Sequence, residues 1–292
     1  MVERRPLPEC KGPGMGGHPQ GPVGSQPVVV SPAWLLGDGA RREPFDHGDG
    51  KPGGRMERVV IDGETFVLKY LHAADDRVMR ATGDVAGQPI TSWQAGWLDR
   101  LPACLDHAVV GAAWDEQPDG RGGAPLMRDV GPWLVPEGDD EIPLDQHSTF
   151  IDYMAKLHVS FWGCRDTLGL LLLPDRFRWF GPGLADAVFD LFDDPTPLVA
   201  GLEATPQTLD HGDWKAGNPG SHPDGRIILL DRAIPGVGPG AADIAWYVCL
   251  NRARLPRSKD DALGTYRAAL ERHGVDTAPW WERPAMDAAE RS

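Results

Sequence analysis

Positive charge is scarce in this sequence. Its 292 residues include 29 Lys and Arg against 43 Asp and Glu, which gives a formal net charge of −14. A nucleic-acid-binding protein needs a basic surface that releases counterions from phosphates. The composition therefore argues against nucleic acid as a partner and favours small, cationic molecules instead.

Cysteine is also scarce. The four cysteines are scattered, with no Cys-x-x-Cys pair and no histidines at zinc spacing: Cys10, Cys104, Cys164 and Cys249. We expect reduced thiols, and neither a disulfide framework nor a zinc site. A chain of this length buries enough apolar surface to fold without such cross-links.

Long apolar runs are missing as well. The run at residues 168–173, which Gly169 interrupts, is far below the roughly 20 residues that span a membrane. The N-terminus lacks the charged start and apolar stretch of an export signal. The sequence thus predicts a soluble, cytoplasmic protein with no membrane partner.

Glycine and proline, in contrast, are abundant, with 36 and 28 residues. Residues 1–27 hold six of each and show almost no apolar periodicity. Such a segment cannot bury enough surface to offset the entropy of ordering it. We expect a disordered tail over residues 1–30 and ordered structure from Ser31-Pro32, where an N-cap serine and an N1 proline predict a short helix.

Residues 31–129 have the pattern of a small sheet-rich unit. Two strand-like segments, 56–61 and 64–71, flank Asp62-Gly63, a strong hairpin signal. A glycine-rich loop precedes them at residues 46–54. We also predict helices within residues 75–101 and strands at 43–45, 108–114 and 125–130.

Residues 130–292 are predominantly helical by the same criteria. Apolar residues and one histidine recur at three- and four-residue spacing on one helical face: Phe150, Ile151, Met154, Leu157, His158 and Phe161. A second helix has an acidic face formed by Asp186, Asp190, Asp193 and Asp194. We predict a hairpin about Asp224-Gly225 and helices at 241–251 and 260–272.

The chemistry concentrates in the segment from His211 to Asn218 and in Asp231, which ends the hydrophobic run 227–230. The segment contains Asp213, Lys215 and Asn218. A carboxylate that accepts a hydroxyl proton, together with an amide and a second carboxylate that hold magnesium, suits phosphoryl transfer. Lys215 adds a cation that would neutralise the transferred group.

This segment resembles the signature of the aminoglycoside phosphotransferase family, which has a protein-kinase-like fold: His-Gly-Asp, four residues, Asn, and then a metal-binding Asp thirteen residues on. Similar residues precede and follow it, among them Lys156-Leu157-His158 and the run from Asp243 to Trp246. The resemblance implies an α+β, bilobal fold with a small antiparallel-sheet N-lobe and a larger, mostly helical C-lobe. It implies that Asp213 is the catalytic base, that Asn218 and Asp231 bind Mg²⁺, and that Asp243 braces the catalytic loop.

In the N-terminal half, the resemblance implies a nucleotide site for ATP or GTP. Lys69 would contact the phosphates, and the loop at residues 46–54 would cover them. The candidate glycines there are Gly48, Gly50 and Gly53. The segment 125–130, with Arg128 and Val130, would be the hinge that binds the purine. The lobes would divide into residues 31–129 for nucleotide and 130–292 for catalysis and substrate.

Two departures from the family pattern stand out. The helix that follows Lys69 usually supplies a glutamate partner, yet residues 73–101 contain none; Asp84, then Asp75 and Asp76, or the uncharged Gln94, are the alternatives. In addition, Pro219-Gly220 follows Asn218 where a strand is expected, and proline cannot donate to a ladder.

We therefore predict a phosphotransferase that moves the γ-phosphate of ATP or GTP to a hydroxyl of a small molecule, for which an aminoglycoside is the family's emblematic acceptor. Two alternatives remain open. One is a nucleotide-binding protein without catalysis, and the other is a metal hydrolase built on His211, Asp213, His222 and Asp231.

Overall fold

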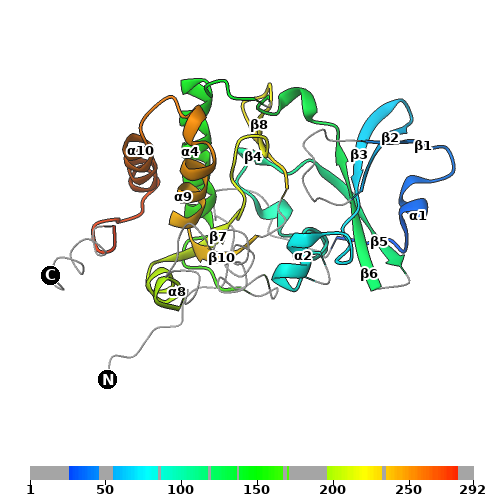
Figure 1. The fold of residues 1–292 in the computed structure, drawn as a ribbon, viewed down its shortest axis with the longest axis horizontal. Helices are drawn as coiled ribbons and strands as arrows, with labels where there is room; N and C mark the ends of the chain where they lie inside the picture. The colour runs from blue at the N-terminus through cyan, green and yellow to red at the C-terminus, as the bar shows by residue number, and fades with distance from the viewer. Residues whose placement is uncertain are drawn as a thin grey trace, which may run out of the picture.

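The computed structural model describes residues 26–45, 55–84, 87–117, 120–136, 138–166, 170, 196–231 and 235–281. A five-stranded antiparallel sheet forms one end of the molecule (Figure 1), in the order β1-β2-β3-β6-β5. Its strands are β1 Arg41–Pro44, β2 Met56–Ile61, β3 Glu64–Lys69, β5 Val109–Gln117 and β6 Gly120–Arg128.

The predicted hairpin joins β2 to β3. Asp62 and Gly63 both have positive φ, 51° and 84°, as a two-residue turn of this kind requires. The register pairs Ile61 with Glu64 and Met56 with Lys69. The turn therefore places Lys69 at the end of β3, which pairs directly with β6, the strand that ends in the segment 125–130.

Short helices cover the sheet. Ser31 caps α1 (Pro32–Leu36) by accepting a hydrogen bond from the Trp34 amide, as predicted. Helices α2 (Arg77–Thr82) and α3 (Gln88–Gln94) and the 3₁₀ turn η1 (Leu98–Arg100) follow β3. Residues 26–30, which the sequence placed in the tail, lie against β5: the Val29 amide donates to the Ala112 carbonyl at 3.0 Å.

The other end of the molecule is built around three helices (Figure 1): α4 Leu144–Ser160, α9 Ala241–Leu250 and α10 Lys259–Arg272. The predicted apolar face of α4 is buried, with Phe150, Ile151, Met154 and Leu157 each 0% exposed. Helix α8 (Thr196–Glu203) and the 3₁₀ turns η2 (Gly131–Trp133) and η3 (Arg252–Arg254) complete the helical elements of the described residues. No helix in this part of the chain is long and apolar enough to cross a membrane.

Two small sheets carry the loops of interest. Strands β7 (Gln207–Asp210) and β10 (Gly236–Pro239) pair antiparallel, and β4 (Leu105–Asp106), β9 (Ile227–Leu229) and β8 (Pro219–Ser221) form a three-stranded sheet. Pro219 is tolerated because it begins β8, an edge strand. Strand β4 precedes β5 in the chain yet pairs with β9, so it joins the sheet of the C-terminal half.

Candidate active site

A cavity of about 810 Å³ lies beside the five-stranded sheet. Its walls come from β3 and β6, from the segment after β6, and from the loops before β8 and after β9. The residues singled out from the sequence that line it are Lys69, Arg128, Val130, Lys215, Asn218 and Asp231. Residues from both halves of the chain thus converge on one space.

Asp213 is held from several directions. Its Oδ1 accepts a hydrogen bond from Trp246 Nε1 at 2.7 Å, and its Oδ2 accepts one from Asn218 Nδ2 at 2.8 Å. Lys215 Nζ lies 2.9 Å from the same Oδ2. These contacts bring Asp213, Lys215 and Asn218 together, as predicted. The side chain of Asp213 is only 13% exposed.

Asp243, in the first turn of α9, holds the backbone of the same loop. Its carboxylate accepts hydrogen bonds from the amides of His211 at 2.7 Å and Gly212 at 2.9 Å. His158 Nε2 lies 3.2 Å from Asp243 Oδ2. Burial alone would raise the pKa of the Asp243 carboxyl, but the hydrogen bond from His158 and the neighbouring groups outweigh burial and lower it.

Lys69 pairs with Asp231. The Lys69 Nζ lies 2.6 Å from Asp231 Oδ1. Burial by itself would lower the pKa of the Lys69 ammonium, and the Asp231 carboxylate outweighs burial and raises it. In turn, the Lys69 ammonium lowers the pKa of Asp231 against the opposing effect of burial.

This pairing differs from the helix partners that the sequence offered. Asp84 accepts hydrogen bonds from the amides of Gly87 and Gln88, and Asp76 caps α2. Both carboxylates stabilise helix starts, and Asp76 also contributes to raising the pKa of the Lys69 ammonium. The ion-pair partner of Lys69 is Asp231, at the strand end 162 residues further on.

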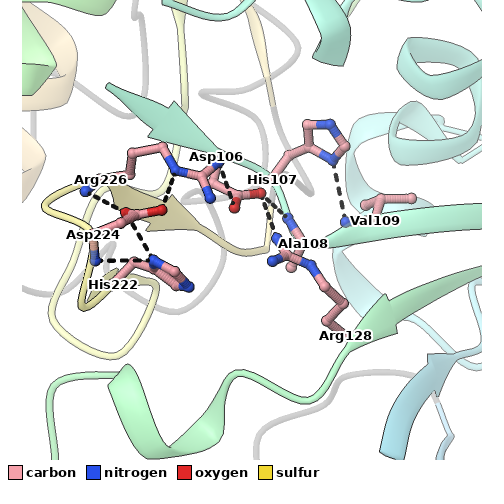
Figure 2. A network of polar contacts seen from close by, with 8 residues as sticks. All are labelled: Asp106, His107, Ala108, Val109, Arg128, His222, Asp224 and Arg226. Atoms are coloured by element: carbon pink, nitrogen blue, oxygen red, sulfur yellow. Dashed lines mark hydrogen bonds and ion pairs between the residues drawn. The ribbon is translucent and has the colours of Figure 1, made fainter. Parts of the chain in front are cut away.

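The hinge segment is anchored by a polar network that Figure 2 shows. The Arg128 guanidinium donates to Asp106 Oδ1 at 2.6 Å, and Arg226 Nη1 lies 3.0 Å from Asp106 Oδ2. Arg128 was a candidate for nucleotide contact; its guanidinium binds this carboxylate while the residue still lines the cavity. Val130 is 3% exposed and packs with Ala108 and Ile228.

Some candidates lie outside the described residues. These are Gly48, Gly50 and Gly53 of the glycine-rich loop and the acidic residues Asp186, Asp190, Asp193 and Asp194. The structure therefore bears on neither group.

Comparison with known proteins supplies the fold. No family model matches the sequence, and no curated protein matches it either. Solved structures do match. The choline kinase LicA from Streptococcus pneumoniae is 12% identical, with a TM-score of 0.50 over 77% of this chain and 74% of that chain. A LicA complex with AMP has 13% identity and a TM-score of 0.52, over 80% of this chain and 76% of that one. A microcompartment-associated aminopropanol kinase reaches a TM-score of 0.50 at 16% identity, over 84% and 80% of the two chains.

The chain has the protein-kinase-like fold of these small-molecule kinases. The resemblance inferred from the sequence, and the α+β class with it, is confirmed at the level of the fold. In this fold, the cavity lies between the five-stranded sheet and the loop that carries Lys215 and Asn218.

The donor set of this kinase-like cavity fits a magnesium ion. Magnesium in phosphoryl-transfer sites binds one or two carboxylates together with substrate phosphates. Asn218 directs its Nδ2 to Asp213, so its amide oxygen is the atom that would face a metal ion. Asp231 lines the same cavity, and its side chain is 38% exposed.

The hydrolase alternative receives no such support. His222 Nδ1 lies 2.7 Å from Asp224 Oδ1, and its ring packs edge-on against Trp133. Across the described ranges, no group of three or more His, Cys, Asp and Glu side chains lies close enough to hold a metal ion.

The sequence did not single out two contacts of the loop from His211 to Asn218. Trp246 binds the Asp213 carboxylate, and Asn251 Oδ1 accepts a hydrogen bond from the Ala216 amide at 2.8 Å. The spacing of Asp243 and Trp246, three apart on one helix, was the available signal, since such residues share a face.

Proposed function

We propose that the protein is a small-molecule kinase of the aminoglycoside phosphotransferase type, which transfers the γ-phosphate of ATP or GTP to a hydroxyl group. The single observation that carries the proposal is the convergence of Lys69, Lys215, Asn218 and Asp231 on one cavity, with Asp213 bound directly to Lys215 and Asn218. The kinase-like fold supports it. The N-lobe, residues 31–129, would hold the nucleotide, and residues 130–292 the catalytic loop and acceptor.

In this proposal Asp213 orients the acceptor hydroxyl and accepts its proton as the hydroxyl oxygen attacks the γ-phosphorus. The bond between that phosphorus and the bridging oxygen breaks, and the nucleoside diphosphate leaves. Lys69 anchors the phosphates, and Lys215 neutralises charge on the transferred group. Asn218 and Asp231 would hold magnesium, which when bound supplies positive charge to the phosphate oxygens.

The structural neighbours and the net charge of the chain indicate a broad class of acceptor. The structural neighbours are named for choline and aminopropanol, both small alcohols that carry a cationic nitrogen, and the net charge of this chain is −14. We therefore propose a small, amine-bearing alcohol or aminoglycoside as acceptor.

A coupled assay of ADP or GDP release, run with ATP and GTP against a panel of aminoglycosides, choline and amino alcohols, tests the function. We expect acceptor-dependent turnover by the wild type and its loss in Asp213→Asn, while nucleotide binding by calorimetry persists. A wild type that binds nucleotide but turns over with no acceptor would instead support the alternative, a nucleotide-binding protein without catalysis.

A further inference from the structure

Helix α9 contacts the catalytic loop at three successive points. Asp243 in its first turn accepts hydrogen bonds from the amides of His211 and Gly212. Trp246, one turn later, donates to the Asp213 carboxylate. Asn251, which caps the helix, accepts from the Ala216 amide. Asp243 and Trp246, three apart, share a helix face, and Asn251 follows the C-terminal end of the helix, so α9 contacts the loop along its length.

The contact from Trp246 differs in kind from the other two. Asp243 and Asn251 hold backbone amides, whereas Trp246 holds the side chain whose proton transfer we propose. The indole N–H reaches Oδ1 at 2.7 Å. The partners of Oδ2 are Asn218 and Lys215, both from the catalytic loop itself.

Those two loop partners also have other tasks in the proposed reaction. Asn218 would face the metal with its amide oxygen, and Lys215 would shift toward the transferred phosphoryl group. The side chain of Lys215 is flexible and 27% exposed. Trp246, by contrast, is a planar ring on a helix that Asp243 also ties to the loop, and it has no other task in the proposed reaction.

We propose that Trp246 is a positioning residue that fixes the Asp213 carboxylate for proton transfer, an inference that rests on the proposed phosphotransferase activity. With Oδ1 held by the indole, the rotation of the carboxylate is restricted, and Oδ2 is the oxygen presented to the acceptor hydroxyl. Positioning of a reacting group contributes to the rate because small displacements from the productive geometry are costly.

The test compares Trp246→Phe, which keeps an aromatic ring but loses the N–H, with Trp246→Gln, which restores a donor. We expect kcat to fall about 10- to 100-fold in Trp246→Phe, with the nucleotide KM and the melting temperature near those of the wild type. Trp246→Gln should recover part of kcat. Trp34→Phe, at a side chain that is 67% exposed on α1, is the matched control and should behave as the wild type.

A second readout does not depend on turnover. In the ¹⁵N-labelled protein, the indole N–H signal of Trp246 is identified by its loss in Trp246→Phe. That signal should move in Asp213→Ala and remain in Asp260→Ala, at an exposed acid on α10.

The outcomes separate the two proposals. If the wild type is active and Trp246→Phe keeps its kcat, the positioning role alone is overturned. The same holds if the indole N–H signal of Trp246 does not move in Asp213→Ala. A wild type without phosphotransfer to any acceptor overturns the proposed function first, and the positioning role falls with it.

Discussion

Gly240, the residue before α9, lies against a buried hydrogen bond. A Cβ at this position would lie 2.6 Å from Tyr266 Oη and 2.8 Å from His158 Nδ1. Those two side chains are 0% exposed and bond each other at 2.7 Å. His158 also reaches Asp243, so a displaced histidine would disturb the brace of the catalytic loop.

We therefore expect Gly240→Ala to lower the free energy of unfolding by about 1–3 kcal/mol, the usual cost of overpacking a core. Urea denaturation measures it. Gly264→Ala is the matched control: it lies within α10 with nothing within 4 Å of the added Cβ, and alanine there should stabilise by about 1 kcal/mol. Equal stability of the Gly240→Ala protein and the wild type would contradict the packing argument.

Lys69 supports a second prediction at this scale. Replacing it by Met removes the cation that pairs with Asp231 and that would bind the nucleotide phosphates. Hydrogen bonds to charged groups contribute about 1.5–3 kcal/mol, so we expect the nucleotide KM to rise about 10- to 100-fold in steady-state kinetics. Lys259→Met, at the exposed start of α10, is the control. A nucleotide KM that stays unchanged in Lys69→Met would remove Lys69 from the phosphate site.

Lys69 also shows which features of the site could be predicted from the sequence. A lysine in an apolar strand requires a charged partner, so its importance was predictable. The identity of the partner was not, because Asp231 is 162 residues away and meets Lys69 only through the packing of two separate sheets. A nearby carboxylate such as that of Asp84 accepts a hydrogen bond from a backbone amide at the start of a helix. Local sequence does not distinguish such a capping residue from an ion-pair partner.

Among the elements, those with strong local signals were predictable. The Asp62-Gly63 hairpin, the Ser31 cap and the apolar face of α4 each depend on residues close in sequence. Strand β4 shows the limit: it has two residues, and Leu105 pairs with Ile227. No local pattern predicts a two-residue strand whose partner lies in the other half of the chain.

Asp106, at the end of β4, links the two halves, and this gives a prediction at the scale of elements. Its side chain is 8% exposed and binds Arg128 of β6 and Arg226 of the β8–β9 turn (Figure 2). Asp106→Asn should cost about 1–2 kcal/mol, less than a fully buried pair, because the arginines are 35% and 38% exposed and solvent screens them. Chemical denaturation measures it, with a smaller loss expected for the more exposed Asp224→Asn.

The pH dependence of this loss has a definite sign. Burial would raise the pKa of Asp106, but the hydrogen bonds from Arg128 and from the Ala108 amide outweigh burial and lower it. A lowered folded-state pKa stabilises the protein above the unfolded value of about 3.9, and this contribution is lost as the pH falls through the folded pKa. The difference between wild type and Asp106→Asn should therefore be constant near neutrality and shrink in acid. A difference that grows below pH 4 would contradict this assignment.

At the scale of the whole molecule, the two-part pattern of the sequence, sheet-rich and then helical, agreed with the bilobal fold that the resemblance of the segment from His211 to Asp231 implied. The sequence does not choose among acceptors, and the acidic residues that it offers for a cationic one, Asp186, Asp190, Asp193 and Asp194, lie outside the described ranges. The side proposed for the nucleotide is better defined, since residues from both halves of the chain line one cavity. A ligand in that cavity would contact both lobes at once.

This shared lining leads to the last prediction. A ligand that binds only the folded protein at 100 times its Kd stabilises it by about 2.7 kcal/mol, which corresponds to a rise in melting temperature of about 5–10 °C. We expect ATP with magnesium to produce such a rise, with the same shift by circular dichroism and by tryptophan fluorescence, because the sheet and the helices are stabilised together. Asp231→Asn should lose the increment that magnesium adds and keep the smaller effect of nucleotide alone, whereas Asp260→Asn should retain both. A magnesium increment that survives in Asp231→Asn would place the ion on other residues, since Asp231 is the carboxylate that we assign to it beside Asn218.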